Sequence, residues 1–175
     1  MNIAGIIFLV LIAIIAYLFI YLTVKINSMD AEIRDKNSEI DGNLWDRAFQ
    51  LSKLVEILQN KSIENDIEVV DVNTFGLGMA ASMQSLNCEK LDVSDEKLRA
   101  ILKEHPELEQ DEDFGTHLAK FNNARVELKK GSLEYNKRVS KYNSFISGFP
   151  VSFIAAFHKK SEKPSFTHYF KEFES

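Results

Sequence analysis

The hydrophobic pattern begins with a long apolar run and continues as regularly spaced apolar positions. Residues 3–24 carry no charged side chain. As an α-helix, at about 1.5 Å per residue, this run is about 33 Å long and can cross a hydrocarbon core of about 30 Å. It therefore predicts a transmembrane anchor over residues 1–24. The tyrosines near its end suit the membrane interface. The anchor positions include Ile3, Leu9, Ile14, Tyr17, Tyr21 and Val24.

A cleaved signal peptide is the alternative interpretation of this run. No Lys or Arg precedes the run, it is longer than the apolar region of a signal peptide, and no small-residue cleavage site follows it. An anchor is the better interpretation. Lys25, Arg34 and Lys36 follow the run, and positive side chains favour the cytoplasmic side of a span. We therefore expect the N-terminus outside and residues 25–175 in the cytoplasm.

Residues 26–59 repeat apolar side chains at steps of three and four, with charged residues between them, which predicts one long amphipathic helix. No Gly or Pro separates it from the apolar run before Gly42, so we expect the anchor to continue into it without a break. The apolar positions are Ile26, Met29, Ile33, Ile40, Leu44, Ala48, Leu51, Leu54, Val55 and Leu58.

Residues 112–148 alternate steps of four and three over about five heptads, which predicts a second long helix with a continuous apolar seam. Arg125 and Ser132 interrupt the seam. A helix this long must bury its stripe against other long helices, so the pattern predicts an all-α fold, an antiparallel bundle behind the membrane helix.

Two Tyr-Asn pairs lie seven residues apart in this second helix and therefore on one face. Tyr135 and Tyr142 fall on the seam and are expected in the core. Asn136 and Asn143 are expected to hydrogen-bond across to a neighbouring helix and fix its register. A binding role for the asparagines is the alternative.

The middle of the chain is less regular. Residues 65–87 begin with alternating β-branched residues, as a short strand would, and continue with apolar residues at helical spacing. We interpret them as one helix weakened by Gly76 and Gly78. Ser94 followed by two acids predicts the start of another helix, which ends before Pro106.

The C-terminal region carries an amphipathic, aromatic segment. Two interpretations stay open: the segment lies in the membrane interface with its lysines near anionic headgroups, or its aromatic residues cap the bundle core. Its residues are Phe149, Pro150, Phe153, Ile154, Phe157, Lys159, Lys160 and Lys163, followed by Phe166, Tyr169, Phe170 and Phe173.

Composition narrows the function. A net charge of −5 argues against a nucleic-acid partner. Cys88 is the only cysteine, so no intrachain disulfide forms, and a buried structural thiol is expected. The histidines show no metal-ligand spacing, the acidic residues 107–113 lack a calcium-loop pattern, and no phosphate loop or catalytic motif is visible. We therefore expect no enzyme activity, no cofactor, no metal and no small-molecule substrate.

The chain resembles the LemA family of bacterial membrane-anchored helical proteins. It departs from the family pattern at Ser52-Lys53 and around Arg125, and residues 60–92 do not align. The residues that carry the resemblance are Ile40-Asp41, Leu44, Arg47, Leu54-Val55, His105-Pro106-Glu107-Leu108, Phe114, Tyr135-Asn136, Tyr142-Asn143, Phe149-Pro150 and Ile154-Ala155.

The resemblance implies an antiparallel bundle of long helices behind one span in the bacterial cytoplasmic membrane, with no enzymatic reaction and a link to membrane or envelope organisation. Membrane confinement raises effective concentration, so weak lateral contacts suffice for assembly. We therefore expect a non-enzymatic scaffold that self-associates or recruits other membrane proteins, with the lipid bilayer as a further partner. The alternative is a signalling or regulatory subunit of an envelope system.

Overall fold

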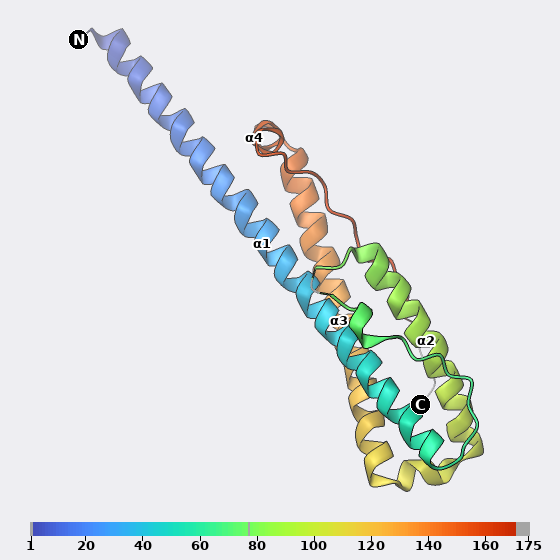
Figure 1. Cartoon of the computed structure of the whole chain (residues 1–175). Helices are drawn as coiled ribbons and strands as arrows, with labels where there is room; N and C mark the ends of the chain where they lie inside the picture. The colour runs from blue at the N-terminus through green and yellow to red at the C-terminus, as the bar shows by residue number, and fades with distance from the viewer. Residues whose placement is uncertain (1, 77, 171–175) are drawn as a thin grey trace. The chain divides into compact units, whose positions relative to one another are not determined.

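The computed structural model describes residues 2–76 and 78–170, so Phe173 of the aromatic tail lies outside the described residues. No strand occurs in these ranges, and the all-α prediction is confirmed (Figure 1). The elements in chain order are α1 (Ile3–Asn60), η1 (Val72–Thr74), α2 (Ala81–Glu104), η2 (Pro106–Gln110), α3 (Glu112–Ser147) and α4 (Val151–Phe157).

Helix α1 is one uninterrupted helix of 58 residues that contains both the apolar run and the amphipathic pattern (Figure 1). Its only interior breaker after the apolar run is Gly42, which a long helix tolerates at a cost of about 1 kcal/mol relative to Ala. All ten apolar positions singled out between Ile26 and Leu58 are buried. The apolar run itself is exposed except for the buried Leu22 and the half-buried Gly5 and Thr23.

The chain forms two compact units. Unit 1 comprises residues 1–34 and 137–164, and unit 2 comprises residues 35–136 and 165–175. Long helices α1 and α3 each contribute to both units.

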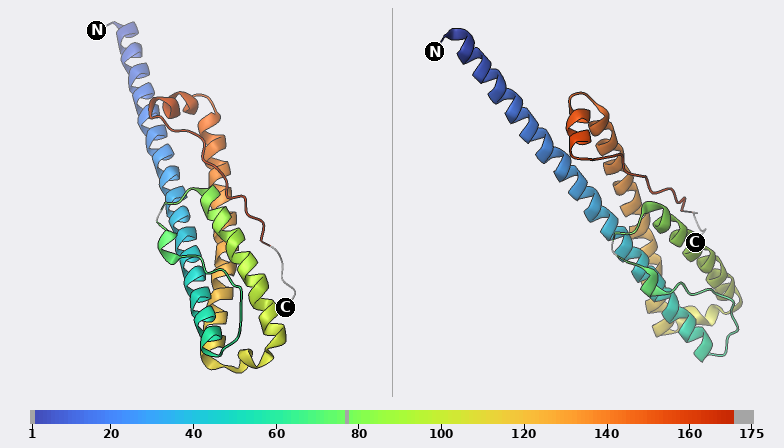
Figure 2. Two further views of the ribbon diagram at one scale, coloured as in Figure 1. Left: turned by 45° about the vertical axis from the view of Figure 1, so that its right-hand side comes forward. Right: turned by 45° about the horizontal axis from the view of Figure 1, so that its top comes forward.

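In unit 1 the first part of α1 packs with the last part of α3 and with α4, which lies crosswise at the end of α3 (Figure 2). The apolar run of α1 is a candidate membrane span by its length and composition, and none of its most apolar window is buried. The core of the unit consists of Leu22, Ile26, Met29, Ile33, Val139, Tyr142, Ile146, Val151, Ile154 and Ala155.

In unit 2, helices α1, α2 and α3 lie side by side (Figure 2). Contacts between α1 and α2 follow increasing residue numbers on both helices, from Asp41 with Gln84 to Arg47 with Asp95, so these two helices are parallel. Helix α3 is antiparallel to α1. Its contacts run in the opposite order, from Lys36 with Glu134 to Gln50 with His117.

This parallel arrangement corrects the prediction for the middle of the chain. After α1 ends at Asn60, the chain must return to the level of Asp41 before α2 begins, a distance of about 28 Å along the helix. The returning segment bonds to side chains of α2 instead of to its own backbone, since Lys97 Nζ donates to the Asp66 carbonyl and the Ser94 hydroxyl donates to that of Glu68. The predicted helix over 65–87 is therefore wrong up to residue 80, where the described residues are irregular apart from η1.

The start of α2 is set by a side chain of α1. Asp41 Oδ2 accepts hydrogen bonds from the backbone N–H of Gly78 (2.6 Å) and of Met79 (3.3 Å), and its Oδ1 accepts one from Gln84 (2.6 Å). Gly78 has a φ of 82°, a conformation that favours glycine. Since α2 then runs unbroken to Glu104, the helix start predicted at Ser94 is also wrong.

Ser94 serves another purpose. It is buried inside α2, and its hydroxyl donates to the backbone carbonyl of Glu68 at 2.9 Å. This bond fastens the returning segment to the helix. The end of α2 falls at Glu104, two residues before Pro106, as the sequence predicts.

Candidate functional site

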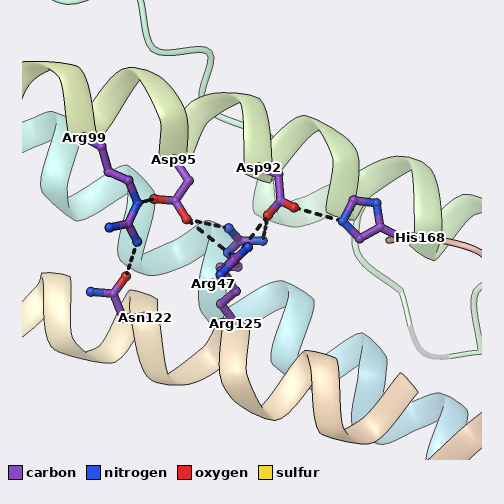
Figure 3. Close-up of polar contacts among 7 residues, drawn as sticks. All are labelled: Arg47, Asp92, Asp95, Arg99, Asn122, Arg125 and His168. Atoms are coloured by element: carbon purple, nitrogen blue, oxygen red, sulfur yellow. Dashed lines mark hydrogen bonds and ion pairs between the residues drawn. The ribbon is translucent and has the colours of Figure 1, made fainter. Parts of the chain in front are cut away.

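Unit 2 contains a cluster of charged side chains in its core (Figure 3). Arg47 of α1 is fully buried, with 0% of its surface exposed, between two carboxylates of α2. Its Nη1 lies 2.7 Å from Asp92 Oδ1 and its Nη2 lies 3.1 Å from Asp95 Oδ2. The guanidinium also stacks over the Phe121 ring of α3, at 4.9 Å from its centroid. Arginine suits this position because its planar cation is weakly hydrated and forms paired hydrogen bonds.

Three further side chains complete the cluster. Arg125 of α3 places Nε 3.5 Å from Asp92 Oδ1 and 3.8 Å from Asp95 Oδ2. Arg99 Nε lies 2.9 Å from Asp95 Oδ1, and His168 Nε2 lies 2.9 Å from Asp92 Oδ2 (Figure 3). The cluster thus connects all three helices and the C-terminal segment of unit 2.

The two carboxyls differ in acidity. Burial disfavours the charge on Asp92, but the hydrogen bond with His168 and the charges of Arg47 and Arg125 outweigh it and hold its pKa below the ordinary value. At Asp95 burial dominates and raises the pKa, although Arg47, Arg99 and Arg125 oppose it. The cluster sets three arginines against two buried carboxylates, and charge pairing of this kind constrains geometry more than it adds net stability.

Two members of this cluster were singled out from the sequence, Arg47 as a family position and Arg125 as a break in the heptad seam. Asp92, Asp95, Arg99 and His168 were missed. Their signal was present, because Asp92 and Asp95 are three residues apart and Arg99 lies four beyond Asp95, so all three share one helix face. The mistaken helix start at Ser94 concealed that face.

The asparagines of α3 hold extended backbone instead of a helix, which corrects the prediction. In unit 2, Asn136 Nδ2 donates to the Phe166 carbonyl and the Phe166 N–H donates to Asn136 Oδ1, both at 2.8 Å. In unit 1, Asn143 makes the same pair of bonds with Lys163, at 2.9 and 2.8 Å. Each amide thereby satisfies the donor and the acceptor of a C-terminal residue that belongs to no helix.

The neighbouring seam residues lie in the cores. Tyr135 is buried in unit 2 and Tyr142 is fully buried in unit 1. Burial raises the pKa of both hydroxyls, and the nearby charge of Asp30 raises that of Tyr142 further. Ile40, Leu44 and Leu54 of α1 are fully buried as well.

Cys88 lies fully buried in α2. Burial raises the pKa of its thiol to about 12, so the thiolate is absent at neutral pH. Within the described residues, no group of three or more His, Cys, Asp or Glu side chains is arranged to hold a metal ion.

Helix α4 of unit 1 has two different faces. Val151, Ile154 and Ala155 are buried against the unit, so Ile154 belongs to the core. Phe149, Phe153 and Phe157 are recurrent at four-residue steps and are exposed by 85%, 75% and 72%. These three phenylalanines form an aromatic stripe. Pro150 precedes the first residue of α4.

The lysines that follow α4 have a partner inside unit 1. Lys160 Nζ lies 2.6 Å from Asp30 Oδ2 and Lys163 Nζ lies 2.9 Å from Asp30 Oδ1. Burial disfavours the charge on Asp30, but the two lysines outweigh it and lower its pKa. Of the three lysines that one of the two open interpretations placed near lipid headgroups, Lys160 and Lys163 form an internal ion pair, whereas Lys159 is exposed.

These features define a class of protein: an all-α chain with a candidate membrane span, whose helices are joined by buried ion pairs and whose C-terminal segment is held by asparagine amides. The chain belongs to the LemA family, since the family model matches residues 36–174. The match begins after the apolar run, so the bundle residues carry it. No curated protein matches the chain closely enough to count as a relative.

Proposed function

We propose that this protein is a membrane-anchored, non-enzymatic helical scaffold that self-associates or recruits partner proteins at the inner membrane surface. One observation carries the proposal: α1 is a single helix that bears an exposed apolar run at its N-terminal end and a stripe of buried residues from Ile26 to Leu58. The same element therefore supplies the anchor and part of both packed units.

The environment of the reactive side chains supports a structural role. The buried charges of Arg47, Asp92 and Asp95 are paired with one another between helices. Cys88 is buried with a raised pKa, the opposite of an activated nucleophile. These groups hold the helices in place and are directed away from solvent.

The surface of unit 2 offers apolar positions for a protein partner. Trp45 and Phe49 stack on α1 with centroids 5.2 Å apart and an interplanar angle of 5°, and Trp45 is 43% exposed. On α3, Val126 and Leu133 are exposed one heptad apart. Aromatic side chains are enriched at protein interfaces, which makes the Trp45–Phe49 pair the first contact to test.

Crosslinking in native membranes tests the proposal. The wild-type chain is expected to give bands of discrete size above the monomer, and Trp45→Ser should weaken them. Val69→Ser, at another exposed apolar position of unit 2, is the matched control. If the wild-type chain yields monomer alone at every crosslinker length, the scaffold function is wrong.

Topology is tested separately. We propose a bacterial cytoplasmic membrane location with the N-terminus outside, on the basis of Lys25, Arg34 and Lys36 after the apolar run. Protease added to spheroplasts should leave residues 25–175 intact and should digest them after lysis. Digestion in intact spheroplasts would show the opposite orientation, with residues 25–175 outside, and would leave the membrane anchor itself unaffected.

A further inference from the structure

Among the described residues of unit 1 outside the apolar run, the large apolar side chains that are exposed are the three of the aromatic stripe. Phe149 and Phe153 contact each other edge to face, with centroids 6.3 Å apart. Because Val151, Ile154 and Ala155 supply the core-facing side of α4, the stripe does not cap the core. Exposed apolar patches of this kind mark sites where a protein contacts a membrane or another protein.

Contacts within unit 1 place the end of α4 beside the apolar run of α1. The rings of Phe157 and Phe19 meet edge to face, with centroids 5.7 Å apart. His158 Nε2 lies 3.1 Å from Thr23 Oγ1. Phe19 precedes Val24, the last residue of the run, by five residues, or about 7 Å of helix. Phe157 therefore lies beside the apolar run, at the level of Phe19 along α1.

The connection after α4 is fastened at a second level of α1. Lys160 and Lys163 pair with Asp30, which follows Val24 by six residues, or about 9 Å of helix. The charged contact thus falls beyond the apolar run, and the aromatic contact falls inside it. This order matches a bilayer boundary, where apolar side chains lie inward and lysines lie outward. Exposed Lys25 and Lys159 lie near the same boundary.

We propose that the aromatic stripe inserts into the lipid beside the anchor, so that α4 is a second membrane contact of this chain. The proposal rests on the anchor function of residues 3–24. It commits to acyl chains as the occupant because the stripe is continuous, through Phe157 and Phe19, with the exposed apolar surface of the candidate span. Short amphipathic segments with aromatic side chains lie at this acyl–headgroup boundary.

Depth-dependent quenching tests the proposal on the full chain. Trp45 is the only tryptophan, and Trp45→Phe removes the background signal. Phe153→Trp then places one fluorophore on the stripe, at an exposed position where the larger ring meets no core atoms. The chain is reconstituted into vesicles of phosphatidylcholine and phosphatidylglycerol with brominated acyl chains. We expect blue-shifted emission and a loss of intensity comparable to that of Tyr17→Trp.

Two controls separate the possible failures. Ser140→Trp, on the exposed surface of α3 in unit 1, should show little quenching, because the neighbouring Arg138 pairs with Glu32 well beyond the apolar run. If Tyr17→Trp is also unquenched, the anchor is wrong and the proposal falls with it. If Tyr17→Trp is quenched and Phe153→Trp and Phe149→Trp are not, the anchor stands and the lipid contact is overturned.

A protein occupant has its own signature. Blue-shifted emission at position 153 without bromolipid quenching, reversed by diluting the chain in the vesicles, would assign the stripe to a second copy and overturn the lipid assignment. The same emission without dependence on dilution would mean that the stripe packs on its own chain, which also overturns it.

Discussion

The side-chain amide of Asn136 pairs with the backbone of Phe166 as a neighbouring strand would, through two hydrogen bonds of 2.8 Å in opposite directions. Phe166 is buried beside it, and its ring stacks with that of Phe170 at 6.2 Å. The asparagine therefore supplies to an isolated extended segment what a sheet would otherwise supply.

Asn136→Ala should release the segment around Phe166. Loss of the bonds leaves the Phe166 carbonyl and N–H unpaired, at a cost of about 1–3 kcal/mol, or an increase of roughly 5- to 150-fold in amide exchange. Hydrogen exchange at the Phe166 amide in the detergent-solubilised full chain measures it. Asn123→Ala, at an exposed position of α3, is the control and should leave exchange unchanged. Equal protection in both variants would mean that packing alone holds the segment.

Arg47→Met should destabilise the protein far more than Arg99→Met. Removing Arg47 takes a fully buried cation away from Asp92 and Asp95, which typically costs about 3–5 kcal/mol. The Arg99 side chain is 34% exposed, so water partly replaces its pairing with Asp95. Thermal denaturation followed by circular dichroism compares the two variants in one detergent. A similar loss of stability in both variants would show that the burial of Arg47 does not determine how strongly it stabilises the protein.

Two carboxyls of α1 should titrate on opposite sides of their ordinary pKa of 3.8. At Asp30, Lys160 and Lys163 overcome burial and lower the pKa. At Asp41, burial raises it against hydrogen bonds from Gln84, Gly78 and Met79. Carboxyl carbon NMR of the detergent-solubilised chain should show the Asp30 midpoint below 3.8 and the Asp41 midpoint above it.

Asp30 and Asp41 therefore affect the pH dependence of folding stability in opposite directions. Since the folded pKa of Asp30 is lowered, its contribution is present above 3.8 and is lost as the pH falls through the folded value. The folded state of Asp41 binds its proton more readily than the unfolded chain, so its contribution is lost as the pH rises above 3.8 through the folded value. Asp30→Asn should abolish the first effect alone. A midpoint for Asp30 above 3.8 would contradict the ion pairs with the lysines.

Gly78→Ala and Gly42→Ala should change stability in opposite directions. Neither site has an atom within 4 Å of an added Cβ, so only backbone conformation matters. Gly78 has a φ of 82°, where Ala costs roughly 1–2 kcal/mol. Gly42 lies inside α1, where Ala is favoured by about 0.5–1 kcal/mol. Melting temperatures of the two variants check this, and destabilisation by Gly42→Ala would contradict it.

The sequence by itself determined the long helices and the family. Apolar residues at steps of three and four are buried from Ile26 to Leu58, and the heptad pattern of residues 112–148 corresponds to α3. These patterns predict helices well because a helix that buries one face must repeat apolar residues at steps of three and four. The uncharged run of residues 3–24 likewise forms one helix with the residues that follow it.

Only the tertiary structure decided what lies opposite each face. The break at Arg125 is explained by Asp92 and Asp95 on α2, and the partner of Asn136 is the backbone of Phe166, neither of which a local pattern specifies. The described residues of 61–80 return between the parallel helices α1 and α2 as irregular backbone apart from η1, held by contacts such as that of Glu68 with Ser94. Local periodicity shows that one face of a helix is buried. The direction of neighbouring helices, their partner residues and their charge pairs depend instead on contacts between residues far apart in the chain.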